Sequence, residues 1–222
     1  MKKALYICFT GIDGSGKTTV SKKLQTEYAS RGFSTRYLHN RYNPVLLYIP
    51  NLIGKKLFLS KSDYYKNYIN HSNAKKEIFK NSLLSNIYQN LLIIDYFLQT
   101  YPSLIYSLIK YDIVISDRYI YDTVLTDLAV DFNNSDEKNR SILSRSFNFF
   151  PKPSLCFFID IPEDIAFKRK NDTPSIDYLI DRKNQYLMVS KENDMIIING
   201  NQELNTEIKD VKKVIDEKIL CR

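Results

Sequence analysis

Several residue types are scarce in this sequence, and each scarcity narrows the class of protein. The 222 residues include no tryptophan, two histidines, three cysteines and six glycines. The cysteines are widely spaced and form no C-x-x-C pair, which excludes a disulfide framework and a cysteine-ligated metal site. Cys8 and Cys156 stand in apolar runs, where a reduced thiol packs as a small hydrophobic side chain. We therefore expect a reducing, cytoplasmic environment.

Long apolar runs are absent as well. No stretch of about 18 uninterrupted apolar residues exists, so we expect no membrane-spanning helix and no membrane partner. The opening residues imitate a signal peptide, but their apolar stretch is too short and leads directly into a glycine motif. The hydrophobic share of 44% and the charged share of 26% are those of a globular protein. The length then predicts a single domain over residues 1–222.

The net charge is +7, but no long basic arm carries it. The 32 basic residues are spread along the chain, and the densest run is Lys168–Lys170. Zinc-finger spacing is also missing. Phosphate-bearing small molecules fit this distribution at least as well as nucleic acid, and we expect no nucleic-acid partner.

Five short apolar runs alternate with helical patterns. The predicted strands are 4–9, 34–42, 112–117, the proline-bracketed run within 151–162, and 195–200. Helical patterns cover 17–32, about 73–110 with a break at Pro102, segments up to about 150, 165–170, 176–190 and 203–220. This alternation predicts an α/β fold, a parallel sheet with helices on both faces.

Three of the six glycines lie in "GIDGSGKTT", residues 11–19. The stretch matches G-x-x-x-x-G-K-[ST], with a predicted strand before it and a helix after it. Glycines let backbone N–H groups approach phosphate oxygens, and the helix N-terminus favours the negative charge. The alternative is a plain Gly/Ser turn beside a helix. We predict an ATP site made by Gly11, Asp13, Gly14, Ser15, Gly16, Lys17, Thr18 and Thr19, in which Lys17 reaches the phosphates and Thr18 holds Mg²⁺.

Two predicted strands end in an acidic residue, Asp117 and Asp160. Either carboxylate can serve as the second magnesium acid, acting through water. We favour Asp117, because an Asp-Arg pair at a strand end places a magnesium acid beside a phosphate clamp. The metal residues we predict are thus Thr18 and Asp117, with Arg118 and Tyr119 on the acceptor side. The alternative for Asp117 is a helix N-cap, and Asp160 fits better as a cap of the next turn.

The basic segment 168–172 interrupts a helical pattern after the fourth predicted strand. Phosphoryl transfer moves negative charge, so a closing basic loop assists it. The alternative is a solvated helix face. We predict a short lid over residues 168–178.

The sequence resembles the thymidylate kinase family in the order and spacing of five stretches. These are "YICFTGIDGSGKTT", "VISDRYIYDT", "LCFFIDIPEDIAFKRK", "RKNQYL" and "IIINGNQELNTEI". The resemblance implies a three-layer α/β/α nucleoside monophosphate kinase fold, with a five-stranded parallel sheet in the order 2-3-1-4-5 and a lid. It implies ATP- and Mg²⁺-dependent transfer to a 5′-monophosphate, typically dTMP, and a homodimer.

The resemblance also implies roles for particular residues. Asp13 matches a carboxylate near the acceptor sugar or the reaction centre, Arg118 an arginine that holds the acceptor phosphate, and Arg169 a lid arginine. The turn after the last strand would surround the adenine through Asn199, Gly200 and Asn201.

Three positions depart from the family pattern. Thr10 stands directly before the first motif glycine, where many members carry an acid. After the second strand, "HNRYNP" replaces Arg-Glu-Pro-Gly and leaves Arg41 as the candidate for the acceptor phosphate. A thymine-reading Asp-Arg pair falls on Ile94 and Asp95, so a carboxylate replaces a guanidinium and reverses the hydrogen-bond character offered to a base carbonyl.

Three hypotheses follow from the sequence. The first is a kinase of nucleoside monophosphates, with dTMP the leading acceptor. The second is a P-loop kinase for a different nucleotide, a nucleoside or a phosphorylated metabolite, supported by Asp95 and the missing Arg-Glu-Pro-Gly. The third is a nucleotide-binding regulatory protein with weak catalysis, for which the apolar stretch 44–60 would be a partner surface. We prefer to interpret 44–60 as a helix packed over the acceptor pocket.

Overall fold

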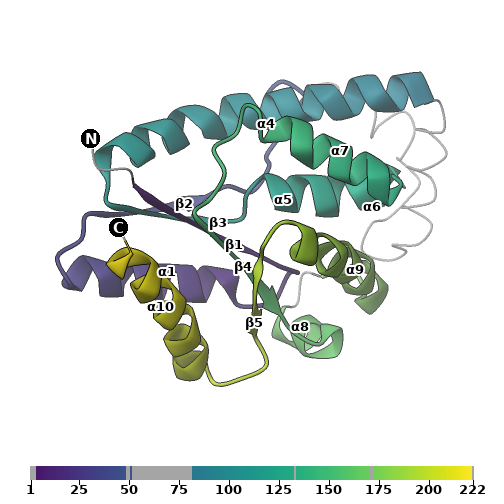
Figure 1. The fold of residues 1–222 in the computed structure, drawn as a ribbon. Coiled ribbons are helices and arrows are strands. Elements are labelled where there is room, and N and C mark those ends of the chain that lie inside the picture. Colours follow the sequence, from purple (N-terminus) through teal and green to yellow (C-terminus); the bar gives the residue numbers. More distant parts are fainter. Residues whose placement is uncertain (1–3, 49–50, 52–81, 133, 171–172, 222) are drawn as a thin grey trace.

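A central parallel sheet organises the protein (Figure 1). The computed structural model describes residues 4–48, 51, 82–132, 134–170 and 173–221. The sheet has five parallel strands in the order β2-β3-β1-β4-β5, which confirms the predicted fold class and strand order. The strands are β1 Leu5–Thr10, β2 Thr35–His39, β3 Ile113–Asp117, β4 Leu155–Asp160 and β5 Ile196–Asn199.

Helices cover both faces of the sheet. In Figure 1, α1 and α10 lie on one face, and α4 with α5, α6 and α7 lies on the other. The helices are α1 Lys17–Ser30, α4 Ser82–Lys110, α5 Ile120–Asp122, the π-helix η1 Thr123–Leu128, α6 Ala129–Phe132, α7 Asp136–Ser146, α8 Glu163–Arg169, α9 Ile176–Glu192 and α10 Leu204–Leu220.

Strand β1 contributes side chains to both hydrophobic cores, one on each face of the sheet. Its side chains alternate between the two faces, as the pleat of a strand requires. Ile7 and Phe9 pack with Val211 of α10 in one cluster, whereas Tyr6 and Cys8 belong to the cluster under α4 to α7. All of β1 is buried, which explains why its sequence is a continuous apolar run rather than an alternating one.

The predicted helix break at Pro102 is wrong, because α4 continues through it from Ser82 to Lys110. A proline removes the backbone hydrogen bond to the carbonyl four residues earlier, here that of Leu98. Both Pro102 and Leu98 are exposed, so water can solvate the freed carbonyl. Buried Tyr96 and Leu104 anchor the helix to the core on either side of the proline. Tertiary packing therefore overrides the local signal.

The carboxyl ends of the parallel strands meet at one edge of the sheet, where ligands bind in open α/β folds. This arrangement places the glycine loop, after β1, beside Asp117 at the end of β3 and His39 at the end of β2. On the other side lie Asp160, at the end of β4, and Asn199, at the end of β5. Within the described ranges, every helix is too short or not apolar enough to span a bilayer.

Candidate active site

The glycine loop has a shape that only glycine supplies. The φ angles of Gly11, Gly14 and Gly16 are 142°, 83° and 96°, in the left-handed half of backbone space. A Cβ at Gly14 would lie 2.3 Å from the Ala166 carbonyl oxygen, and one at Gly11 would lie 2.7 Å from that of Ile159. The loop therefore needs glycine both for its turns and for its close approach to α8 and β4.

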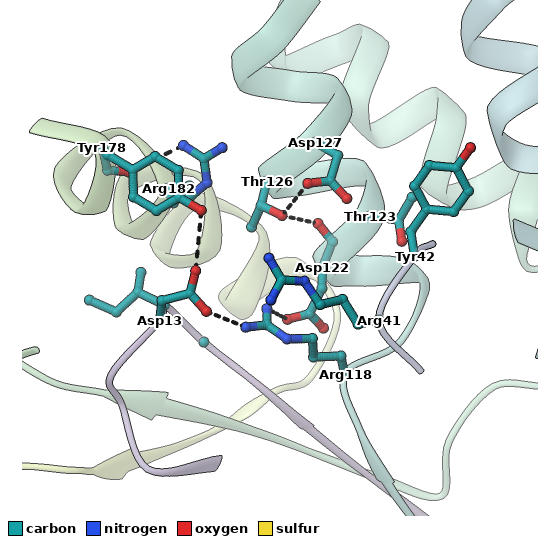
Figure 2. A pocket seen from close by; sticks show the side chains of 12 residues that line it. Asp13, Arg41, Tyr42, Arg118, Asp122, Thr123, Thr126, Asp127, Tyr178 and Arg182 are labelled. Atoms are coloured by element: carbon teal, nitrogen blue, oxygen red, sulfur yellow. Dashed lines mark hydrogen bonds and ion pairs between the residues drawn. The ribbon is translucent and has the colours of Figure 1, made fainter. Parts of the chain in front are cut away.

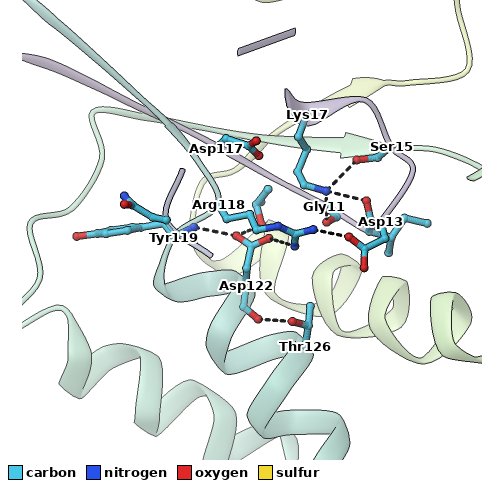
Figure 3. Close-up of polar contacts among 12 residues, drawn as sticks. Gly11, Asp13, Ser15, Lys17, Asp117, Arg118, Tyr119, Asp122 and Thr126 are labelled. Atoms are coloured by element: carbon cyan, nitrogen blue, oxygen red, sulfur yellow. Dashed lines mark hydrogen bonds and ion pairs between the residues drawn. The ribbon is translucent and has the colours of Figure 1, made fainter. Parts of the chain in front are cut away.

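Lys17 folds back over this loop. Its Nζ donates to the carbonyl oxygens of Gly11 and Ile12, each at 2.7 Å, and to Ser15 Oγ at 3.3 Å (Figure 3). Burial, helped by the charge of Arg118, lowers the pKa of Lys17 to about 8. The ammonium group is thus held in the cradle and desolvated, where an anionic ligand would strengthen its charged form.

The N-terminus of α1 is open to an anion. Gly16 is its N-cap, no side chain caps the helix, and its first turn contains no acidic residue. The Thr19 N–H bonds the Gly16 carbonyl at 2.9 Å, which leaves the earlier N–H groups without an intrahelical acceptor. An uncapped helix end that follows a glycine loop fits phosphate.

Asp117 and Thr18 lie side by side at the carboxyl end of β3. Asp117 Oδ2 accepts from Thr18 Oγ1 at 2.5 Å and from Tyr37 at 2.9 Å, and it contacts His39 Nδ1 at 3.1 Å. Its Oδ1 is buried and has no hydrogen-bond partner among the described residues. Burial raises the pKa of Asp117, but Thr18, Lys17 and Tyr37 outweigh it and the pKa lies below its usual value. This oxygen donor set fits Mg²⁺.

Arg118 has a backbone conformation that is uncommon for a side-chain-bearing residue, with φ at 73°. Its guanidinium pairs with Asp13 through one terminal nitrogen and with Asp122 at 3.2 Å through the other (Figure 3). Burial lowers the pKa of Arg118, but these carboxylates more than reverse the effect. Such backbone strain persists where surrounding contacts impose it, and it clusters at functional sites.

Asp13, in the glycine loop, joins three parts of the chain. Besides Arg118, its carboxylate accepts from the Tyr178 hydroxyl at 3.2 Å and lies 3.5 Å from Lys170 Nζ. Burial raises the pKa of Asp13, but the charges of Arg118, Lys17 and Lys170 hold it well below its usual range. The carboxylate is therefore ionised and ties the loop to both walls of the pocket.

These residues surround a small pocket, seen in Figure 2. Its volume of about 20 Å³ leaves room for about one water molecule. Three arginines from different elements face it, and the buried Arg182 stacks 3.6 Å above the Tyr178 ring. The lining residues are Gly11, Ile12, Asp13, Arg41, Tyr42, Arg118, Asp122, Thr123, Thr126, Asp127, Tyr178 and Arg182.

One pocket wall is a π-helix. Thr123, Thr126 and Asp127 all belong to η1, and π-helices are rare and often occur at functional sites. No sequence signal pointed to these residues, because a π-helix has no distinctive spacing in the sequence. Tyr178 falls at the end of the predicted lid, and Arg182 in a stretch that resembles the family. Neither had a predicted role in the pocket, since both lie in an ordinary amphipathic helix.

Two predicted acceptor residues lie away from the pocket. Tyr119 is fully buried, donates to the Pro151 carbonyl at 2.9 Å, and packs edge-on against Tyr6 and Phe150. Tyr119 directly follows Arg118 in the sequence, but its side chain packs into the hydrophobic core and does not line the pocket.

Asp95 is the second of these residues. Its carboxylate is buried and accepts the backbone N–H groups of Val45, Leu46 and Leu47 at 2.9–3.1 Å, together with the Tyr42 hydroxyl at 3.1 Å. Burial raises its pKa, but these hydrogen bonds hold it below the usual value. Asp95 thus fixes the segment 42–47. The rest of the stretch 44–60 lies outside the described residues apart from Tyr48 and Asn51.

The predicted lid and the predicted adenine turn are in contact. Arg169, at the end of α8, donates to the Gly200 carbonyl at 3.3 Å. A Cβ at Gly200 would lie 3.3 Å from the Ser15 carbonyl oxygen, so this turn adjoins the glycine loop. The Asn201 N–H bonds Asn199 Oδ1 at 2.9 Å. Within the predicted lid, residues 171–172 lie outside the described part of the chain.

Asp160 takes a different role from the predicted cap. Its carboxylate forms an ion pair with Lys183 Nζ at 2.9 Å, and Pro162 is the N-cap of α8. Asp160 therefore links the end of β4 to the middle of α9.

The sheet order, the glycine loop and the strand-end acid together define an α/β fold of the P-loop kinase type. The chain is similar to curated thymidylate kinases. It is 22% identical over 222 residues to the probable thymidylate kinase of Staphylothermus marinus, covering 97% of this chain and 96% of the relative. It is 25% identical over 214 residues to that of Methanothermobacter thermautotrophicus, covering 95% and 94%. The thymidylate kinase of Leptospira interrogans matches at 25% over 174 residues, covering 77% and 70%. No family model matches the chain.

Proposed function

We propose that the protein is an ATP- and Mg²⁺-dependent nucleoside monophosphate kinase, with dTMP as the first candidate acceptor. One observation carries the proposal: the glycine loop and an arginine-lined pocket share Asp13, so a donor site and an acceptor site meet at one carboxylate. The names of the similar proteins support the same activity.

The donor side would work mainly by electrostatics. Bound MgATP supplies the phosphoryl group, and phosphoryl transfer needs positioned positive charge more than covalent help from the protein. Lys17 would hold the transferred group, because its ammonium already lies in the loop. Thr18 and Asp117 would hold the metal, the latter through its unpaired Oδ1. Arg169 would close from the lid.

The acceptor side would bind the monophosphate through arginines. Arg118 is anchored internally and Arg41 and Arg182 face the same pocket, which suits a group with two negative charges. The pocket as it stands has room for about one water molecule, so we propose that it opens further when a nucleotide binds. Its closure would exclude water from the transfer.

The second candidate function is a kinase for a different acceptor. The contacts of Asp95 weaken the case for it. Asp95 was the sequence argument against thymine, but its carboxylate is occupied by the segment 42–47. Asp127 in the π-helix lines the pocket and is a second carboxylate that could influence the choice of acceptor. A carboxylate there would select acceptors with a hydrogen-bond donor.

A coupled ADP-release assay tests the proposal across dTMP, dUMP, the other monophosphates and free nucleosides. Turnover highest with dTMP supports the first candidate, and turnover with another acceptor supports the second. ATP binding without turnover on any acceptor would leave only the third hypothesis, a regulatory protein.

We further propose that two copies pair through α4. Five large apolar side chains on this helix recur at spacings of three and four and are 44–54% exposed: Leu84, Ile87, Leu91, Ile94 and Leu98. This spacing puts them on one helix face. The helix α4 itself contains only two charged residues, the buried Asp95 and the terminal Lys110.

Sedimentation equilibrium tests this pairing. Leu91→Glu should convert a dimer into a monomer, because it buries a charge in the paired faces. Leu220→Glu is the matched control, since Leu220 is exposed at the far end of α10. A monomeric wild-type protein at micromolar concentration would contradict the proposal.

A further inference from the structure

Asp122 is a buried carboxylate directly behind Arg118. Its Oδ2 accepts from Thr10 Oγ1 and from the Tyr119 N–H, each at 3.0 Å, and its Oδ1 accepts from the Tyr186 hydroxyl at 2.7 Å. Arg118 pairs with the same Oδ1 at 3.2 Å. Figure 3 shows this carboxylate on the side of the guanidinium opposite Asp13.

The two carboxylates that hold Arg118 differ in their surroundings. Asp122 is 4% exposed and fixed by neutral donors from β1, the start of α5, and α9. Asp13 contacts Lys170 of the predicted lid and Tyr178 of α9, of which Tyr178 lines the pocket. An incoming phosphate can therefore replace Asp13 beside Arg118, whereas Asp122 stays in place. A buried guanidinium needs such a permanent partner, because an unpaired buried charge is costly.

Thr10 is the last residue of β1 and stands directly before the first glycine of the loop. Its hydroxyl donates to Asp122, so a carboxylate of α5 lies within hydrogen-bond distance of the strand end that leads into the loop.

We propose that Asp122 is a positioning residue that holds Arg118 for the acceptor phosphate. This inference rests on the proposed function, in which Arg118 binds that phosphate. Asp122 acts through Arg118 and touches no reacting atom.

Capping of α5 is the competing role, because the Tyr119 N–H needs an acceptor. A cap requires an oxygen but no charge. Asp122→Asn keeps an oxygen and removes the charge, so it separates the two roles. If Asp122 only caps α5, this variant keeps the acceptor KM of the wild type.

The first measurement is steady-state kinetics of Asp122→Asn with the monophosphate that the wild type uses best. We expect the KM for the acceptor to rise about tenfold or more, with the KM for ATP within about twofold, because Arg118 loses its fixed partner. An unchanged acceptor KM in a folded variant overturns the inference.

The second measurement exchanges the two residues. Thr10→Asp alone places two carboxylates in contact, and Asp122→Thr alone removes the charge, so each should raise the acceptor KM. The double variant, Thr10→Asp with Asp122→Thr, should return it to within about threefold of the wild type, a coupling that independent sites do not show. A folded double variant no better than either single variant overturns the inference.

Thermal melting shows whether each variant folds. Tyr186→Phe provides a milder test should the others unfold, because it removes one donor to Asp122 and keeps the ring that stacks on Phe158 at 5.4 Å. We expect a two- to fivefold rise, about 0.4–1 kcal/mol, in acceptor KM alone. No rise overturns the inference. A wild-type protein that phosphorylates no monophosphate overturns the proposed function first and this inference with it, so the two failures are distinguishable.

Discussion

The glycine loop and the pocket beside it hold charge with different parts of the chain. In residues 11–18 the backbone shapes the site: three glycines have positive φ, and Lys17 folds over the carbonyls of Gly11 and Ile12. The pocket instead depends on side chains from separate elements, such as Arg118 after β3, Asp122 of α5 and Arg182 of α9. Backbone N–H groups can recognise a phosphate but not the group attached to it. Side chains can be substituted one by one, so a pocket built from them can be adapted to a particular acceptor.

The largest effect should come from the loop. Lys17→Ala should lower kcat by about 100- to 1,000-fold, because it removes the cation closest to the transferred phosphoryl group. Lys23→Ala is the control, since Lys23 is exposed on the same helix. The ADP-release assay measures both, and near-normal turnover of Lys17→Ala would show that the loop does not carry the chemistry.

Arg118→Ala should impair use of the acceptor while leaving ATP binding to the glycine loop nearly unchanged. We expect the kcat/KM for the acceptor to fall about 100-fold, since a charge-assisted phosphate contact is lost, while ATP affinity stays within about threefold. Calorimetry of ATP binding and acceptor kinetics separate the two halves. Arg36→Ala, on exposed β2, is the control. Collapse of ATP binding with intact acceptor affinity would reverse the assigned role.

The same contrast explains how far the sequence could predict the molecule. The loop was found because all its determinants are local: the glycines, Lys17 and Thr18 occupy eight consecutive positions. The strands β1, β3 and β4 were found because they are buried on both faces and therefore read as nearly continuous apolar runs. The edge strands β2 and β5 are only partly buried, and their signal is weaker. Neither argument needs tertiary information.

The pocket could be predicted only in part. Arg118 was found from its place at a strand end. Asp122 and Arg182 lie in stretches that resemble the family but had no predicted role, since only the packing of α5 and α9 aims them at the pocket. Asp95 was assigned from its position along a helix, which does not reveal that three N–H groups of residues 45–47 saturate its oxygens. Side-chain assemblies of this kind depend on the fold, so sequence spacing alone underdetermines them.

Asp95→Asn tests whether Asp95 stabilises the fold or recognises the acceptor base. It should reduce the free energy of unfolding by about 1–3 kcal/mol, because an amide leaves part of the buried N–H cluster unpaired. The ranking of acceptors should stay the same. Thermal melting and the acceptor panel measure the two outcomes. Asp210→Asn, at an exposed carboxylate on α10, is the control. A changed base preference would return Asp95 to the recognition site.

The smallest predicted effect is a proton taken up by the loop. Burial lowers the pKa of Lys17 to about 8 in the protein without nucleotide, so about half of the amines are neutral at pH 8. Phosphate oxygens beside Nζ favour the ammonium form and raise this pKa toward its unperturbed value. ADP binding at pH 8 should therefore take up roughly half a proton, and less at pH 7, where Lys17 is already charged. Calorimetry in buffers of different ionisation enthalpy measures this uptake. Equal uptake at both pH values would mean that the loop amine does not titrate on binding, and that the cradle holds Lys17 charged before the nucleotide arrives.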